Sequence, residues 1–147
     1  PKLASILYAL DRGMVADEMT GHLESGHYIL CDRYIESNIT YQQAKLPEKE
    51  REEFFKWLTD LEHNELRVPV SDAVLFLRVP VDISRTNMDN REELDGHEEN
   101  QNYQQEVLRS YESLAKDSDK WTIIDCTNNG EMCSREEIHK EIYQAIQ

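Results

Sequence analysis

The chain lacks any long apolar run, so no segment of the sequence is suited to cross a lipid bilayer as a helix. It also lacks the pattern of a secretory leader, because Pro1-Lys2-Leu3 opens directly into an amphipathic stretch. These two absences argue against a membrane partner and against export. We therefore expect a cytoplasmic protein.

Positive charge is also scarce. The 147 residues include 16 Lys and Arg against 30 Asp and Glu, which gives a formal net charge of −14. Such a surface repels the nucleic-acid backbone and anionic lipid, so we expect neither as a partner. Any phosphate site must be built from arginines that cluster locally. A chain of this length can bury one real core, and we expect a single domain over residues 1–147.

Cysteine is rare, and the spacing of the three cysteines indicates no metal or redox site. Cys31, Cys126 and Cys133 form neither a CxxC motif nor a spacing typical of metal ligands. Cys31 and Cys126 each end an apolar run, where a cysteine is most often a small buried hydrophobe. This usage indicates a reduced protein.

The sequence alternates helical and strand patterns, which is typical of an α/β protein with a parallel sheet flanked by helices. Apolar residues keep a helical spacing from Leu3 to Leu23, and Gly26 is placed to end that helix. A second helix begins at Pro47. The other expected elements are strands over 28–31, 73–77 and 121–124, a short helix over 81–90, a charged connection over 91–99, a long helix around 103–114, a loop with its turn at 128–130, and a last helix to 146 with Ser134 as N-cap and Glu137 as capping-box partner.

The most informative segment joins the strand over 28–31 to the helix after it. The apolar run stops at Asp32 and Arg33, and ligands of parallel α/β sheets bind outside the carboxyl ends of strands. There an Asp can accept from metal-bound water and an Arg can grip a phosphate. The alternative is a surface Asp-Arg pair that only caps a strand. Four polar residues on the next helical turns favour a site: Ser37, Asn38, Tyr41 and Gln42.

Another absence concerns nucleotide binding. No glycine-rich strand-turn-helix and no GxxxxGK[ST] loop occur in the sequence. A complete nucleotide-binding protein of the P-loop class would carry such a loop. The sequence therefore has a candidate phosphate site at Asp32 and Arg33 but no loop of the kind that binds the phosphates of a nucleotide donor.

Residues 6–12 read ILYALDR, and residues 32–42 read DRYIESNITYQ. These two segments resemble the LLFAADR segment and the DRYxxSxxAYQ signature of the thymidylate kinase family, and further segments resemble that family in order along nearly the whole chain. The others are residues 72–77 with Val79-Pro80 for the fourth-strand motif, 94–98 for the lid exit, 111–115 for the helix after it, and 121–126 for the strand that ends in IDA.

The resemblance implies a three-layer parallel sheet of the P-loop nucleoside monophosphate kinase type. It implies transfer of the ATP γ-phosphoryl group to dTMP, giving dTDP for dTTP biosynthesis, with ATP and Mg²⁺ as cofactors. The family is typically a homodimer packed through helices. The apolar face of the first helix is a candidate for that contact, although the sequence does not separate such a face from core.

The resemblance also implies roles on the acceptor side. Arg33 and Arg12 would hold the acceptor phosphate, unless they are surface salt-bridge formers. Asp32 would lie by the magnesium ion through water and would form the catalytic set with Arg33 and Arg91. Four more residues would contact the nucleoside: Tyr8 in place of the Phe that stacks on thymine, Ser37 and Asn38 at the pyrimidine edge, and Tyr41 against C2′ of the sugar, with Gln42 beside them.

Some of these residues also have structural interpretations. By periodicity alone Tyr8 would be core, and Ser37 and Asn38 would form local hydrogen bonds to the backbone at a helix start. On the donor side, the resemblance places a lid at about 84–99. Arg91 within it would contact ATP, unless it is simply solvated, and Asp125 and Cys126 would approach the adenine.

The family's first strand, phosphate-binding loop and following helix have no counterpart in the sequence. We expect an N-terminally truncated chain with little kinase activity of its own, because nothing cradles the β- and γ-phosphates. The alternatives are a protein whose N-terminal portion is a separate chain, a loop-less relative that binds nucleotide or dimerises without catalysis, and a kinase for another nucleoside monophosphate.

Overall fold

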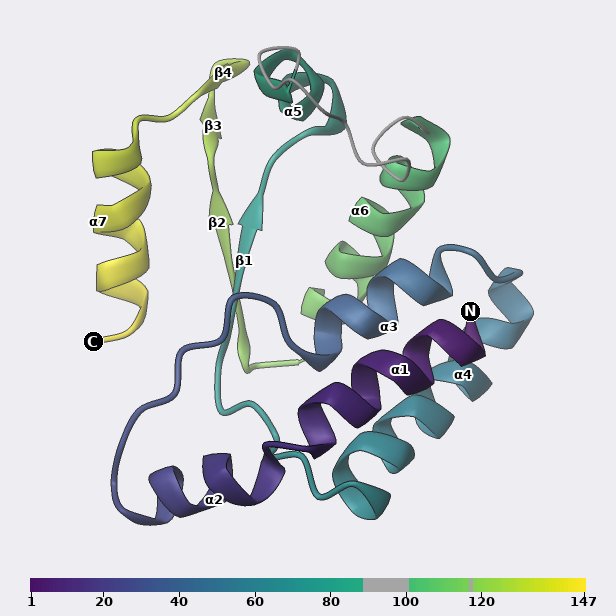
Figure 1. Cartoon of the computed structure of the whole chain (residues 1–147). Coiled ribbons are helices and arrows are strands. Elements are labelled where there is room, and N and C mark those ends of the chain that lie inside the picture. Colours follow the sequence, from purple (N-terminus) through teal and green to yellow (C-terminus); the bar gives the residue numbers. More distant parts are fainter. Residues whose placement is uncertain (89–100, 117) are drawn as a thin grey trace. The chain divides into compact units, whose positions relative to one another are not determined.

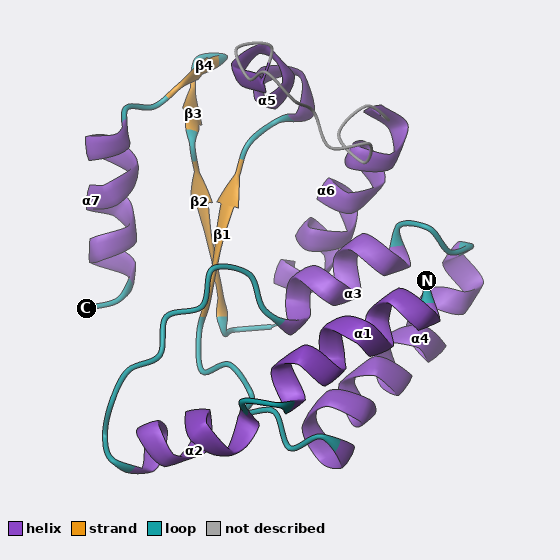
Figure 2. Cartoon of the chain, in the orientation of Figure 1, coloured by secondary structure: helices purple, strands orange, loops and turns teal. Residues whose placement is uncertain are grey.

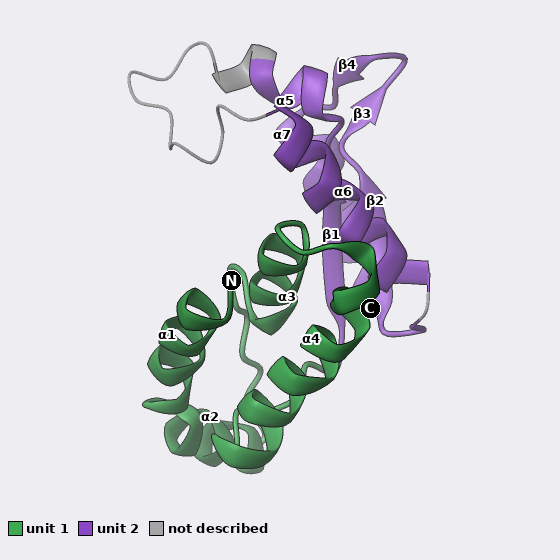
Figure 3. Cartoon of the chain, turned by 90° about the vertical axis from the view of Figure 1, so that its right-hand side faces the viewer, with its two compact units in different colours: residues 1–71 green, residues 72–147 purple. Residues whose placement is uncertain are grey.

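The computed structural model describes residues 1–88, 101–116 and 118–147. The chain divides into two compact units, Pro1–Ser71 and Asp72–Gln147, and each is described by itself (Figure 3). Unit 1 contains α1 Lys2–Gly13, α2 Ala16–Glu24, α3 Ile35–Gln43, α4 Glu48–Asp60 and the π-helical turn η1 Leu61–Glu65 (Figure 1). Unit 2 contains β1 Val74–Arg78, α5 Val81–Met88, α6 Gln101–Lys116, β2 Trp121–Asp125, β3 Thr127–Asn128, β4 Glu131–Met132 and α7 Arg135–Ala145.

The first predicted helix is two helices, which break at Met14 and Val15. The break follows Gly13, where an added Cβ would lie 3.4 Å from the Cβ of Leu66, so α1 ends in close contact with the chain after η1. Gly26 ends α2 as expected. It has φ of 79°, and the N–H groups of Gly26 and His27 donate back to the carbonyls of Leu23 and His22, which is a Schellman ending.

The core of unit 1 comes from α3, α4 and the segment after η1. Ile35, Ile39, Phe54, Leu58 and Val68 are all buried. Each such side chain contributes about 1.5–3 kcal/mol when removed from water. The buried face of α1 is instead made of small residues, Ser5 and Ala9, which lets α3 approach closely. Three leucines of α1 are exposed, Leu3, Leu7 and Leu10, and so is Met14, which follows the helix directly.

The predicted strand over 28–31 is wrong. These residues have no regular structure in Figure 2, and Tyr28 and Leu30 are 101% and 94% exposed. Cys31 is exposed too, so its predicted burial is also wrong. An apolar run becomes a strand only where a neighbouring strand accepts its hydrogen bonds, and within the described residues this segment is paired with none. The buried Cys126 agrees with its prediction.

Unit 2 is built on a two-stranded parallel sheet, and its strands match the predicted strands over 73–77 and 121–124 within one residue. β1 pairs with β2 in the register Val74↔Trp121 to Arg78↔Asp125. Helices α6 and α7 lie on opposite sides of this sheet (Figure 1), and the α/β class is therefore in agreement with the expectation. Phe76 stacks on Tyr111 of α6, with ring centroids 4.9 Å apart.

The last part of unit 2 combines one unpredicted element with one confirmed element. The expected loop contains a short antiparallel hairpin, β3 and β4, whose turn residues Asn129 and Gly130 have φ of 51° and 83°. This is the conformation of a type I′ turn, for which Asn-Gly is favoured. The capping box is present: the Glu137 N–H donates to Ser134 Oγ, and Ser134 N–H donates to the Glu137 carboxylate at 2.7 Å.

None of the helices in the described part of the chain combines the length and the apolar character that crossing a bilayer requires.

Candidate functional site

The predicted acceptor residues of unit 1 lie on α1, on α3 and on the bend that leads into α3. At this bend Arg33 has φ of 66°, a left-handed conformation that residues other than glycine rarely adopt. Such a backbone costs about 1–3 kcal/mol and is found preferentially at functional sites. The next residue anchors the bend, because the Tyr34 hydroxyl donates to the Pro69 carbonyl at 2.7 Å. Burial raises the pKa of this tyrosine, so the hydroxyl stays a donor.

Arg33 is oriented by Tyr41, two turns along α3. The guanidinium carbon lies 5.1 Å from the centre of the Tyr41 ring, and Nη2 is 3.4 Å from the Tyr41 hydroxyl oxygen. A cation over an aromatic face is attracted by about 0.5–1 kcal/mol at an exposed site. The arrangement holds a cation at the amino end of α3, where anions are favoured. Asp32 is exposed beside it on the same bend.

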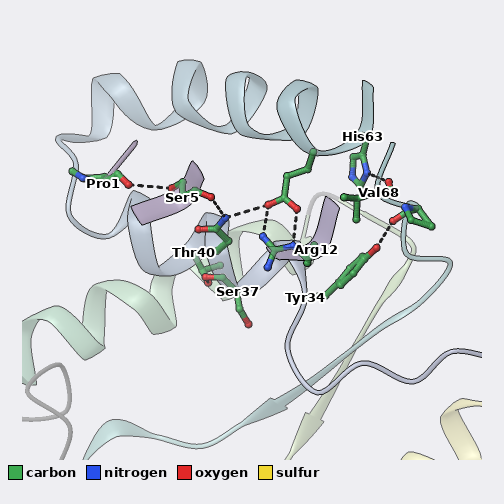
Figure 4. Close-up of polar contacts among 11 residues, drawn as sticks. Pro1, Ser5, Arg12, Tyr34, Ser37, Thr40, His63 and Val68 are labelled. Atoms are coloured by element: carbon green, nitrogen blue, oxygen red, sulfur yellow. Dashed lines mark hydrogen bonds and ion pairs between the residues drawn. The ribbon is translucent and has the colours of Figure 1, made fainter. Parts of the chain in front are cut away.

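Arg12 and Asn38 lie together in a buried polar network (Figure 4). Arg12 Nε donates to Glu62 Oε2 at 2.6 Å, and Arg12 Nη2 donates to Glu62 Oε1. Asn38 Nδ2 donates to the same Glu62 Oε1 at 3.1 Å and to the Ser5 carbonyl at 3.1 Å. The Glu62 side chain has no exposed surface, whereas Arg12 keeps 17% of its side chain exposed. This network joins α1, α3 and η1.

The other predicted acceptor residues differ in accessibility. Tyr8 is 56% exposed and lies one turn before Arg12 on α1, so the core interpretation does not hold for it. Gln42 is buried on the same side of α3 as Asn38, and its Oε1 accepts from Lys45 Nζ at 3.5 Å. Ser37 is half-buried in the first turn of α3, and its N–H donates to the Tyr34 carbonyl.

Asp32, the residue predicted to lie by the magnesium ion, is exposed. Within residues 1–88, 101–116 and 118–147, no group of three or more His, Cys, Asp or Glu is arranged to hold a metal. Magnesium in nucleotide enzymes is usually held by one or two carboxylates together with substrate phosphates and water. A lone, exposed Asp32 next to Arg33 fits that mode.

On the donor side, Asp125 is engaged by an arginine that the sequence analysis missed. Arg78 and Asp125 are register partners at the carboxyl ends of β1 and β2, and Nε and Nη2 of Arg78 donate to the two Asp125 oxygens at 2.6 and 2.7 Å. This hydrogen bonding holds the pKa of Asp125 below its usual value and raises the pKa of Arg78. Glu112 adds a contact to Arg78 Nη1 at 3.5 Å.

The other two residues predicted for the ATP side are Cys126 and Arg91. Cys126 is buried and its Sγ lies 3.7 Å from the Ile124 carbonyl; burial raises its thiol pKa. Arg91 and most of the predicted lid at 84–99 lie outside the described residues.

The sequence contained signals for both missed residues. Glu62 continues the buried stripe of Phe54 and Leu58 at intervals of four residues, so an acid stands where the helical period predicts an apolar side chain. Arg78 ends the strand run just as Asp125 ends its parallel partner. Opposite charges at the two carboxyl ends of neighbouring strands signal a cross-strand pair.

Comparison with known proteins gives the chain its family. The model of the family described as thymidylate kinase matches residues 1–142. The chain belongs to the thymidylate kinase family. A thymidylate kinase of Nostoc sp. is 32% identical over 144 residues, which are 96% of this chain and 64% of that protein. One from Fervidobacterium nodosum is 27% identical over 127 residues, 84% of this chain and 58% of that protein.

A shorter match of higher identity involves a thymidylate kinase of Trichormus variabilis, which is 55% identical over 38 residues, 25% of this chain and 18% of that protein. The chain spans less than two thirds of the length of these thymidylate kinases. The comparisons therefore establish the family of the chain, and its activity and ligands are proposed below.

Proposed function

We propose that this chain supplies the dTMP-binding part of a cytoplasmic thymidylate kinase, which transfers the γ-phosphoryl group of ATP to dTMP and forms dTDP and ADP. The observation that carries the proposal is Arg33. It holds a strained left-handed backbone and lies over the Tyr41 ring, so its guanidinium is fixed before any ligand arrives. A preorganised cation at a helix amino end is suited to a phosphate group.

The acceptor residues divide into two groups in this proposal. Arg33 holds the acceptor phosphate, and Asp32 lies where a magnesium ion bound to phosphates would approach. Tyr41 packs against the deoxyribose and Tyr8 against the base, with Ser37 and Gln42 nearby. Arg12 shares the Glu62 carboxylate with Asn38, so we assign it with Asn38 to the pyrimidine edge rather than to the phosphate.

The proposed ATP-side roles follow from the family, and fewer of the 147 residues contribute to them than to the acceptor side. Phosphoryl transfer relies on positioning and on neutralising charge, and magnesium supplies charge neutralisation at the phosphates when bound. Asp125, Cys126 and Arg91 are the proposed ATP-side residues. The 147 residues contain no GxxxxGK[ST] loop, so the three-layer sheet and the phosphate cradle of the proposed enzyme require the family's strand-loop-helix in addition.

The proposal is tested by dTMP binding to the 147-residue chain, measured by calorimetry. Arg33→Ala should weaken dTMP about tenfold to a hundredfold, since hydrogen bonds to charged groups contribute about 1.5–3 kcal/mol. Arg67→Ala is the matched control, because Arg67 is an exposed arginine of the same unit with φ of 56°. Equal effects of the two variants, or no dTMP binding by the parent chain, would refute the proposal.

A second variant tests which nucleotide is bound. Tyr41→Ala should reduce the preference for dTMP over the corresponding ribonucleotide, because the bulk of the ring against C2′ is lost. An unchanged preference would contradict the sugar assignment. Tighter binding of another nucleoside monophosphate than of dTMP would point to a different kinase of the same fold.

The proposed homodimer would use the exposed face of α1. Leu3, Leu7, Leu10 and Met14 lie along one side of this helix and are 75%, 63%, 48% and 87% exposed. A contiguous apolar face of this kind is rare on a monomer surface. Leu7→Glu should convert a dimer to a monomer in sedimentation experiments, whereas a parent chain that is monomeric at all concentrations would exclude this interface.

A further inference from the structure

Glu62 is a buried carboxylate whose hydrogen-bond partners are both residues of the proposed acceptor site. Its Oε2 accepts from Arg12 Nε, and its Oε1 accepts from Arg12 Nη2 and Asn38 Nδ2. Arg12 lies on α1, Asn38 on α3 and Glu62 in η1, so one side chain fixes the relative positions of three elements. The π-helical turn itself is held by the Val68 N–H, which donates to the Glu62 carbonyl at 2.9 Å.

Stability alone does not account for a carboxylate at this place. A buried ion pair is often no more stabilising than apolar side chains of the same volume, because desolvation offsets the Coulomb attraction. Glu62 continues the apolar stripe of Phe54 and Leu58, where a leucine would complete the core. An acid there fits a role in orienting its partners.

Each partner keeps one hydrogen-bonding group after Glu62 is satisfied. Glu62 occupies Nε and Nη2 of Arg12, and among the described residues the Nη1 group makes no hydrogen bond. Asn38 is 5% exposed, and its Oδ1 has no hydrogen-bond partner in the described part of the chain. A buried acceptor without a partner normally costs about 1–3 kcal/mol. A donor and an acceptor held by one carboxylate match a ligand edge that offers a carbonyl next to an N–H, such as the imide edge of thymine.

We propose that Glu62 is a positioning residue for recognition of the pyrimidine base. It holds Arg12 and Asn38 in the arrangement that contacts the base, and it does not act on the phosphate, which Arg33 binds, or on the sugar, against which Tyr41 packs. The inference rests on the proposed function. Its consequence is that Glu62 controls the part of dTMP affinity that comes from the base and leaves the sugar-phosphate part unchanged.

The test uses two probes on the whole chain: dTMP, and 2-deoxyribose 5-phosphate, which lacks the base. Glu62→Gln removes the charge that holds Arg12, and ligand-observed NMR gives both affinities. We expect dTMP to bind about tenfold more weakly or worse, corresponding to one lost charged hydrogen bond, with the sugar phosphate unchanged. Glu52→Gln is the matched control, because Glu52 pairs with Lys56 on the exposed side of α4.

Each outcome decides the proposal. An unchanged dTMP affinity, or an equal loss for both probes, overturns it, the second result being what a purely structural role gives. If Trp57 fluorescence shows that Glu62→Gln is unfolded, Glu62→Asp decides by the same criteria, because it keeps the charge and shortens the reach by one methylene. If the parent chain binds neither probe, the proposed function and this inference are both refuted. If the parent chain binds dTMP and Glu62→Gln binds it equally well, only this inference is refuted.

Discussion

Each unit contains an arginine that donates two hydrogen bonds to a carboxylate far away in the sequence, but the two pairs lie in different surroundings. In unit 1, Arg12 and Glu62 are 17% and 0% exposed. In unit 2, Arg78 and Asp125 are 34% and 55% exposed. The hydrogen-bond geometry of the two pairs is similar, but their access to water differs. A buried pair makes each partner depend on the other, whereas an exposed pair can exchange its partner for solvent at little cost.

The largest expected effect comes from breaking the buried pair. Arg12→Met leaves Glu62 as an uncompensated charge and should lower the free energy of unfolding of unit 1 by about 3–5 kcal/mol. Denaturant unfolding followed by Trp57 fluorescence in a Trp121→Phe background isolates this unit, since the chain has only these two tryptophans.

The double variant Arg12→Met with Glu62→Leu serves as the control for that experiment. Removing both charges should restore most of the lost stability, because two apolar side chains replace the pair. A single variant that costs less than about 1 kcal/mol would show that Glu62 finds water or another partner, and the contrast between the units would disappear.

A comparable effect is expected for the apolar core beside this pair. Leu58 is fully buried, so Leu58→Ala should cost about 2–5 kcal/mol through lost transfer energy and the cavity left behind. Val70→Ala, at a valine of the same unit that is 55% exposed and lies outside α1, should cost no more than about 0.5 kcal/mol. Similar losses for the two variants in the same Trp57 assay would contradict the difference in burial between Leu58 and Val70.

In unit 2 the Ser134 cap of α7 should contribute more to stability than the Arg78–Asp125 ion pair. Ser134→Ala removes the side-chain acceptor for the Glu137 N–H and should cost about 1 kcal/mol. Faster hydrogen exchange in the first turn of α7 is the measurement. Gln144→Ala, at an exposed position in the last turn of the same helix, is the control and should leave that exchange unchanged.

The smallest effect is expected for the exposed pair. Arg78→Gln should lower stability by at most about 1 kcal/mol and less in high salt. Arg78 depresses the pKa of Asp125 in the folded state, so the contribution is full above the unfolded-state pKa, about 3.9, and fades as the pH falls through the lower folded value. NMR titration should show the Asp125 pKa returning toward its usual value in the variant. An unchanged pKa would contradict the pair.

Local patterns predicted several elements well. The capping box at Ser134, the glycine ending at Gly26 and the Asn129-Gly130 turn depend on a few neighbouring residues, and each forms as its local chemistry requires. The two strands of the parallel pair were also recognisable, because their apolar runs are bounded on both sides. The roles of the acceptor residues stay predictions.

Failures arose where a residue needs a distant partner. The run over 28–31 has the composition of a strand, but composition does not provide a neighbouring ladder, and within the described residues it pairs with none. For the apolar face of α1 the sequence left core and dimer contact both open, and in the structure α1 instead buries Ser5 and Ala9. Periodicity shows that a face exists, and the packing partner determines whether that face is buried.

The sequence alone determined the class of the protein, the glycine ending at Gly26, the capping box at Ser134 and the Asn129-Gly130 turn, because these depend on neighbours in the chain and on short motifs. Only the tertiary structure decided that Arg12 and Asn38 share the carboxylate of Glu62, 50 and 24 residues away. The physical reason is burial. Until the chain folds, Glu62 is one of 30 acidic residues in water, and exclusion of that water ties it to its two partners.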